Sequence, residues 1–176
     1  MSVVAVQRRE PSQMLVPLAI ATVAFRPAGW WATAWVIVAA GMVVGVASPP
    51  TVSLPRRWPV AVAAGCVVFA VVPLLWRGPS ASRVGALGVV ASVVAAVAEE
   101  FVFRRSLYGV LQERGEAMAV VASAALFALA HVPSYGWGVV PIDFAAGLIF
   151  AWQRHVTGSW TAPAATHSFA NLVQVL

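Results

Sequence analysis

Charged residues are scarce in this 176-residue sequence, making up only 10% of it, whereas 61% of the residues are hydrophobic. A water-soluble domain carries about 25% charged residues to cover its surface. The low charge and the mean hydropathy of +0.86 fit instead a helix bundle whose outer surface faces lipid. The length is that of one compact domain. The sequence therefore predicts a single membrane-embedded domain over residues 1–176.

Cysteine is nearly absent as well, because Cys66 is the only one in the chain. A single thiol excludes an intramolecular disulfide and a cysteine metal cluster. Cys66 lies in the apolar run VAVAAGCVVFAVV, where a small buried or lipid-facing side chain is expected. The sequence has no low-complexity tail, linker or recognisable soluble domain, so we expect any chemistry to take place within the bundle.

The formal net charge of +5 raises the question of a nucleic-acid partner. The arginines stand singly and in pairs between apolar runs, however, which is the pattern of membrane topology rather than of a nucleic-acid surface. With a cytoplasmic N-terminus, eight arginines fall on the inside and three on the outside. We therefore expect an integral protein of the plasma (inner) membrane with its N-terminus in the cytoplasm, and no nucleic-acid partner.

Apolar runs recur along the whole chain and predict an all-α, polytopic transmembrane helix bundle. Pro17 interrupts the first run, and Arg26 follows it without a cleavage site, so we expect a retained helix rather than a signal peptide. A span needs about 20 residues, so several runs are slightly short. We predict about seven spans, with six or eight possible, at residues 12–25, 30–47, 59–76, 84–103, 117–132, 139–153 and 159–176.

Two pairs of small residues have a spacing that lets helices approach each other closely. Gly41 and Gly45 form a GxxxG pair, and Gly147 with Ala151 forms its weaker analogue. In a chain rich in glycine and alanine, the same residues can equally be lipid-facing, so both interpretations stay open.

Ionisable side chains inside the predicted spans point to a functional site. Each costs about 2.5–3.5 kcal/mol on insertion scales, so such residues face the bundle interior and are functional by default. They gather in three segments, AEEFVFRR, LFALAHVP and ATHSFANL. Each alone has a structural explanation, such as a packed histidine or a solvated turn, but the three together favour a catalytic site.

Helical spacing separates the two carboxylates of the first segment. Glu100 and Arg104 are four residues apart with the acid first, the favourable order for an ion pair on one helix face. Glu99 is rotated by about 100° from Glu100, so the same arginine cannot easily hold both. The spacing therefore assigns a structural pair to Glu100 and Arg104 and leaves Glu99 as a candidate general base.

The other two segments repeat the four-residue spacing. His167 and Asn171 project from one helix face, where imidazole and carboxamide can together stabilise a developing oxyanion. Phe127 and His131 have the same spacing, so the aromatic ring can pack beside the imidazole. Asp143 follows a proline at the expected start of a helix, and we expect it to cap that helix.

At these residues the sequence resembles the CPBP family of intramembrane proteases, which includes the type II CAAX prenyl endopeptidases and bacteriocin-processing relatives. The stretch FAAGLIFAWQRHVTGSWTAPAATHSFAN is also similar to the last helices of that family, with Ala151 in place of a glycine. The resemblance covers roughly residues 85–176, which would carry the catalytic core, and shows no signature in residues 1–84. The family motifs EExxxR, FxxxH and HxxxN are matched by Glu99–Glu100–Arg104, Phe127–His131 and His167–Asn171.

The resemblance implies an intramembrane glutamic-type endopeptidase that acts on a membrane-associated protein or peptide without a cofactor or metal. Glu99, assisted by His131, would activate water, and His167 with Asn171 would form the oxyanion hole. Glu100, Arg104 and Phe127 would support them. Substrate identity and oligomeric state stay open at this point.

Two other functions remain to be distinguished. A metal-dependent membrane peptidase could use the same Glu and His side chains, although the chain has no HExxH motif and asparagine is a poor zinc ligand. A non-enzymatic membrane protein, such as an immunity factor or scaffold, could also carry intramembrane carboxylates and histidines.

Overall fold

The structure, a computed structural model, describes residues 57–75 and 85–175. The expected runs at 12–25 and 30–47, with Gly41 and Gly45, lie outside these residues. The described part is helical and contains no strand, as the all-α prediction requires. Its elements are α4 (Trp58–Leu75), α5 (Ala86–Glu100), the π-helical segment η1 (Phe101–Leu107), α6 (Tyr108–Gln112), α7 (Glu116–Tyr135), the short 3₁₀ turn η2 (Trp137–Val139), α8 (Val140–Thr157) and α9 (Thr161–Val175).

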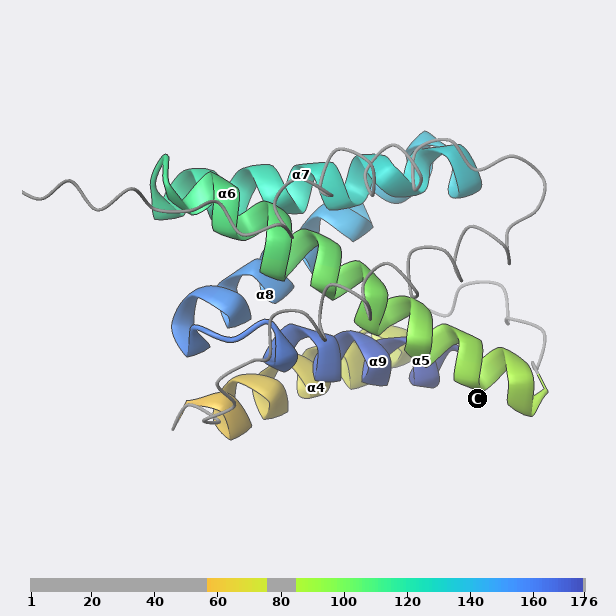
Figure 1. Ribbon diagram of the computed structural model, residues 1–176. Helices are drawn as coiled ribbons and strands as arrows, with labels where there is room; N and C mark the ends of the chain where they lie inside the picture. Colours follow the sequence, from red (N-terminus) through yellow and green to blue (C-terminus); the bar gives the residue numbers. More distant parts are fainter. Residues whose placement is uncertain (1–56, 76–84, 176) are drawn as a thin grey trace, which may run out of the picture.

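The helices form two layers joined by one long diagonal helix (Figure 1). Helix α7 belongs to one layer, and helices α4 and α9 belong to the other. Segments α5, η1 and α6 form a continuous helix from Ala86 to Gln112. This helix begins beside α9 and ends beside α7. Because Glu99 and Glu100 stand near its middle, the carboxylates lie where the two layers meet.

Two helices among the described residues are long and apolar enough to cross a bilayer, Ala86–Gln112 and Glu116–Tyr135. The predicted count of seven spans is therefore not confirmed. The first of these helices is also longer than the apolar run at 84–103 that predicted it. The run ends at two arginines, but the Arg104 side chain is fully buried and bonded inside the bundle. A satisfied internal charge need not end a helix, so the apolar run underestimated its length.

Helices α7 and α8 form a tight antiparallel hairpin. Gly136 follows α7 with φ +78°, a conformation that L side chains rarely adopt, and the chain then turns back into α8. A Cβ on Gly147 would meet the Ala124 Cα at 3.0 Å. Of the two interpretations of the Gly147–Ala151 pair, the structure therefore supports close helix approach. The hairpin brings the end of α7 opposite the start of α8.

A buried amide ties α8 to α4 and α9. The Gln153 Nε2 atom donates to the Ala61 carbonyl at 2.7 Å and to the Thr166 hydroxyl at 2.8 Å. Both Gln153 and Thr166 are fully buried. Hydrogen bonds between buried polar groups fix their elements against one another. The network therefore sets the position of α9 at the residue next to His167.

Candidate active site

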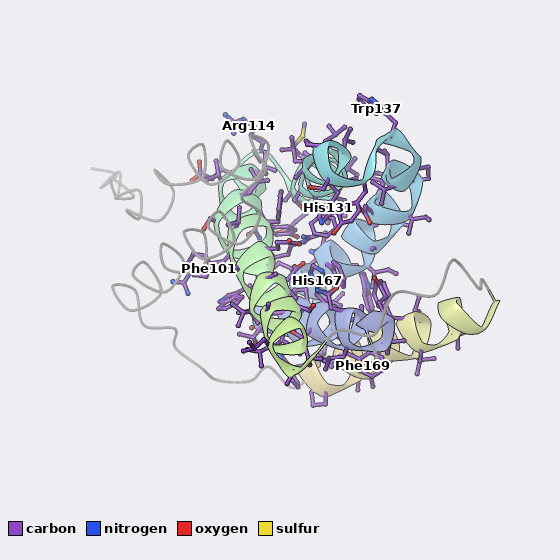
Figure 2. All side chains as sticks on the ribbon, turned by 90° about the vertical axis from the view of Figure 1, so that its right-hand side faces the viewer. Phe101, Arg114, His131, Trp137, His167 and Phe169 are labelled. Carbon is purple, nitrogen blue, oxygen red and sulfur yellow. The ribbon has the colours of Figure 1, made fainter. Side chains whose placement is uncertain are left out.

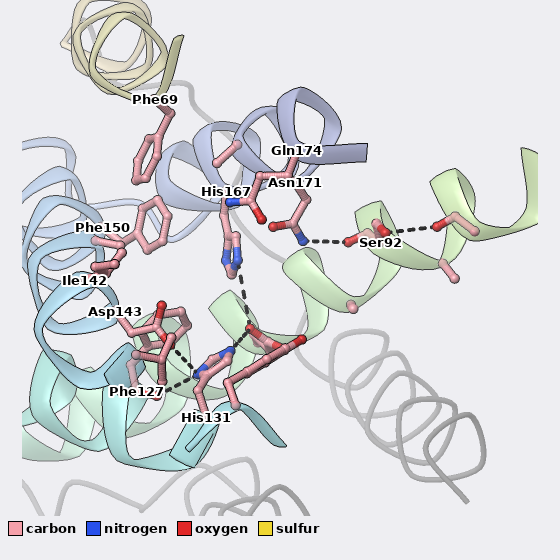
Figure 3. Close-up of a pocket in the computed structure, with 18 residues that line it drawn as sticks. Phe69, Ser92, Phe127, His131, Ile142, Asp143, Phe150, His167, Asn171 and Gln174 are labelled. Carbon is pink, nitrogen blue, oxygen red and sulfur yellow. Dashed lines mark hydrogen bonds and ion pairs between the residues drawn. The ribbon is translucent and has the colours of Figure 1, made fainter. Parts of the chain in front are cut away.

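A cavity of about 560 Å³ opens between α5, α7, α8 and α9, with Phe69 of α4 at one side. Figure 3 shows His131 and His167 approaching each other across it from α7 and α9. Figure 2 shows both histidines inside the helix bundle, whereas Arg114 and Trp137 lie at its periphery. The cavity wall includes five residues selected from the sequence, namely Glu99, Phe127, His131, His167 and Asn171.

Glu100 lies behind the cavity wall and binds two partners through one oxygen. Its Oε1 atom is 3.2 Å from Arg104 Nη1 and 2.9 Å from His167 Nδ1. Arg104 donates a second hydrogen bond from Nη2 to the Gly147 carbonyl at 3.0 Å. The side chains of Glu100 and Arg104 are both fully buried. The structure thus contains the ion pair that the four-residue spacing predicts, and extends it to α8 and α9.

Aromatic rings surround the buried guanidinium. The Arg104 Cζ atom lies 4.6 Å from the ring centre of Phe127 and 5.3 Å from that of Phe150. Phe150 also stacks on the His167 ring, with centroids 4.7 Å apart. Cation–π contacts stabilise a desolvated cation by about 2 kcal/mol. Phe127 therefore packs against Arg104 as well as against His131, whose ring centre is 4.7 Å away.

Glu99 faces the cavity rather than Arg104. Its Oε2 atom lies 3.6 Å from His131 Nε2 and 3.9 Å from His167 Nε2. The two adjacent carboxylates therefore have different surroundings, one fully buried in an ion pair and the other at the cavity between two imidazoles. This division matches the separation of Glu99 from Glu100 that the helical rotation predicts.

The backbone of α7 sets the tautomer of His131. The Nδ1 atom lies 2.9 Å from the Phe127 carbonyl oxygen. Because a carbonyl oxygen only accepts, Nδ1 must carry a proton, and Nε2 is the nitrogen that faces Glu99. The Glu99 carboxylate and this nitrogen can therefore act together on one substrate or water molecule at the cavity wall.

His167 and Asn171 each have one partner already. Asn171 donates from Nδ2 to the Ser92 carbonyl of α5 at 3.0 Å, which leaves its second N–H for another acceptor. His167 faces Glu100 with Nδ1, so its Nε2 atom is the one directed toward Glu99. The two side chains lie on the same wall of the cavity, as their spacing predicts (Figure 3).

A π-helical segment, Phe101–Leu107, follows the two glutamates directly. Such segments are rare and occur frequently at functional sites. The segment includes Arg104, whose carbonyl accepts a hydrogen bond from Arg154 Nε of α8 at 3.1 Å. The irregular backbone therefore lies where the carboxylate pair is anchored to α8.

Asp143 has a different role at this site from the one predicted from the sequence. It lies in the first turn of α8, but the helix has no side-chain cap, so the expected capping role is wrong. Its Oδ2 atom instead lies 3.7 Å from His131 Nδ1, and its side chain lines the cavity. An ionisable residue inside a predicted span was the signal that could have identified it. Phe150 and the Gly147 carbonyl had no such signal.

Within residues 57–75 and 85–175, no three His, Cys, Asp or Glu side chains have an arrangement that could hold a metal ion. The carboxylates and imidazoles at the cavity lie within 4 Å of one another. Such a set can accept, hold and transfer a proton at a single point.

Comparison with known families gives one match, over residues 81–173, to the family described as type II CAAX prenyl endopeptidase Rce1-like. The matched region contains all of the cavity-lining polar residues described above. Neither the curated proteins nor the solved structures gave a significant match.

Proposed function

Because this chain belongs to the Rce1-like family of type II CAAX prenyl endopeptidases, we propose that it hydrolyses a peptide bond with water activated by Glu99 and His131. At the level of the family, the protein is a membrane protease that acts on a protein or peptide at the membrane. The observation that carries the proposal is the position of Glu99 Oε2, 3.6 Å from His131 Nε2 at a cavity wall.

In the proposed reaction, Glu99 is the general base. It takes a proton from a water that also contacts His131 Nε2, and the resulting hydroxide attacks the scissile carbonyl carbon. A base placed within hydrogen-bond reach of its water contributes about 10²–10⁴-fold to the rate. Glu100 cannot easily take this role, because its side chain is fully buried behind the cavity wall and its Oε1 atom is shared by Arg104 and His167.

His167 and Asn171 are proposed to hold the oxyanion that forms on the substrate. The second N–H of Asn171 is one donor, and His167 Nε2 is the other proposed donor atom. Glu100 accepts from His167 Nδ1 at 2.9 Å and thereby turns Nε2 toward the cavity. Oriented donors in a site from which water is excluded need no reorganisation as the charge develops.

We further propose that the protein lies in the plasma membrane with its N-terminus in the cytoplasm, as the arginine distribution predicts.

Apolar residues such as Phe69, Ile142 and Ala146 line the cavity beside the polar groups. A cavity of this kind can take up an apolar segment of a membrane-associated substrate and bring its amide to Glu99.

The test is hydrolysis of a quenched prenylated peptide ending in a CAAX motif by the full chain in vesicles. We expect Glu99→Gln to abolish cleavage while the protein still inserts and keeps its melting temperature. Glu113→Gln is the matched control, because it removes one carboxylate from an exposed turn. Normal cleavage by Glu99→Gln would rule out the mechanism, and wild-type protein that cleaves no such peptide would contradict the assignment of this substrate.

A further inference from the structure

Asp143 approaches the catalytic histidine from the side opposite Glu99. His131 has Glu99 Oε2 at 3.6 Å from Nε2 and Asp143 Oδ2 at 3.7 Å from Nδ1. The α7–α8 hairpin produces this arrangement, since His131 stands near the end of α7 and Asp143 near the start of α8. The imidazole therefore lies between two carboxylates that come from different helices (Figure 3).

One oxygen of the Asp143 carboxylate lacks a hydrogen-bond donor. Its Oδ2 atom is buried and makes no hydrogen bond to the described part of the chain. A buried carboxylate oxygen without a donor is costly. The ring orientation does not need it, because the Phe127 carbonyl already holds Nδ1 at 2.9 Å. What Asp143 adds is negative charge beside the ring.

Asp143 also ends a row of charged groups across the site. The row alternates carboxylates and imidazoles and then reaches a guanidinium. Side-chain exposure falls along it, from 19% for Asp143 to 14% for Glu99 and 0% for Glu100. The members, in spatial order, are Asp143, His131, Glu99, His167, Glu100 and Arg104. Arg104 supports the Glu100 end, and the group in ion-pair contact with Asp143 is His131, with His167 acting on it from farther away.

We propose that Asp143 is a positioning residue that stabilises the positive charge of His131 while this ring delivers a proton to the leaving amine. The inference rests on the proposed peptidase function. As the carbon–oxygen bond forms, Glu99 takes one proton from water and passes it to His131 Nε2. His131 then donates this proton to the amide nitrogen as the carbon–nitrogen bond breaks. During the transfer His131 is an imidazolium, and the adjacent Asp143 anion lowers its free energy.

The charge on Asp143 should matter most when the leaving group needs a proton. An amide nitrogen must be protonated to leave, whereas an ester oxygen depends on protonation far less. The experiment compares a prenylated CAAX peptide with the same peptide carrying an ester at the scissile bond. Both are given to the full chain in vesicles, as wild type, Asp143→Asn, Asp143→Glu and the exposed-site control Glu113→Gln.

We expect Asp143→Asn to lower kcat for the amide by about 10- to 100-fold, with KM nearly unchanged and kcat for the ester within about threefold. Asp143→Glu, which restores the charge, should recover most of the amide activity. Equal losses for amide and ester, or no recovery with glutamate, would overturn the role of Asp143 alone. Cleavage that continues unchanged in Glu99→Gln would instead overturn the proposed function, and this inference with it.

Discussion

Glu100 binds His167 across 67 residues of sequence, with 2.9 Å between Oε1 and Nδ1. The same oxygen accepts from Arg104, so one buried carboxylate joins η1 and α9. This contact fixes which nitrogen of His167 faces the cavity. It also distinguishes the two adjacent glutamates, because Glu100 is buried in this contact whereas Glu99 lies at the cavity.

Glu100→Gln tests this buried contact through stability. The change removes the negative charge between Arg104 and His167 and leaves the guanidinium buried without its counter-ion. Loss of one partner of a buried ion pair costs about 3–5 kcal/mol, so we expect a clearly lower melting temperature as well as lower activity. Thermal unfolding in detergent measures the effect. An unchanged melting temperature would show that the pair contributes little to the fold.

Gly147→Ala tests the close approach of α7 and α8. The new methyl group would lie 3.0 Å from the Ala124 Cα atom, which belongs to the backbone and cannot turn aside. Overpacking of this kind costs about 1–3 kcal/mol. The matched control is Gly109→Ala in α6, where a Cβ meets nothing within 4 Å. We expect thermal unfolding to show a loss for the first variant only, and equal melting temperatures would contradict the packing described.

Asn171→Ala tests the oxyanion pair. The variant loses the donor proposed to stabilise the transition state, and such a loss lowers kcat by about 10²–10³-fold. KM should change much less, as steady-state kinetics on the prenylated peptide can show. Ser168→Ala, on the same helix, removes only a hydroxyl that bonds to the Ala164 carbonyl and should keep near-normal kcat. A main effect on KM would assign Asn171 to substrate binding instead.

Exhaustive chelation separates the proposed mechanism from a metal-dependent one. If Glu99 and His131 activate water by themselves, dialysis against a strong chelator should leave the rate within about twofold, since no Lewis acid is required. Metal analysis of the dialysed protein accompanies the measurement. Loss of activity that added zinc restores would establish the metal-dependent mechanism.

The spacing of residues along single helices predicted much of the candidate site. Glu100 and Arg104 stand four residues apart on one helix, so their pairing follows from helix geometry alone. The same geometry separates Glu99 from Glu100: in the structure Glu99 faces His131 and Glu100 pairs with Arg104, while His167 lies near both. Because charge is scarce in this chain, the remaining polar residues are conspicuous, and His131, His167 and Asn171 can be selected from the sequence alone.

Contacts between helices could not be predicted from the spacing of residues along the sequence. Asp143 and His131 are 12 residues apart on two helices, and only the turn at Gly136 brings them to 3.7 Å. The helix Ala86–Gln112 was predicted to end just before Arg104. An apolar run cannot show that the arginine is hydrogen-bonded to another helix, here to the Gly147 carbonyl of α8. The sequence by itself determined an all-α chain and the polar residues proposed for its site, since composition and helical period act locally. Tertiary structure alone decided which carboxylate faces which imidazole, because that depends on how α5, α7, α8 and α9 pack.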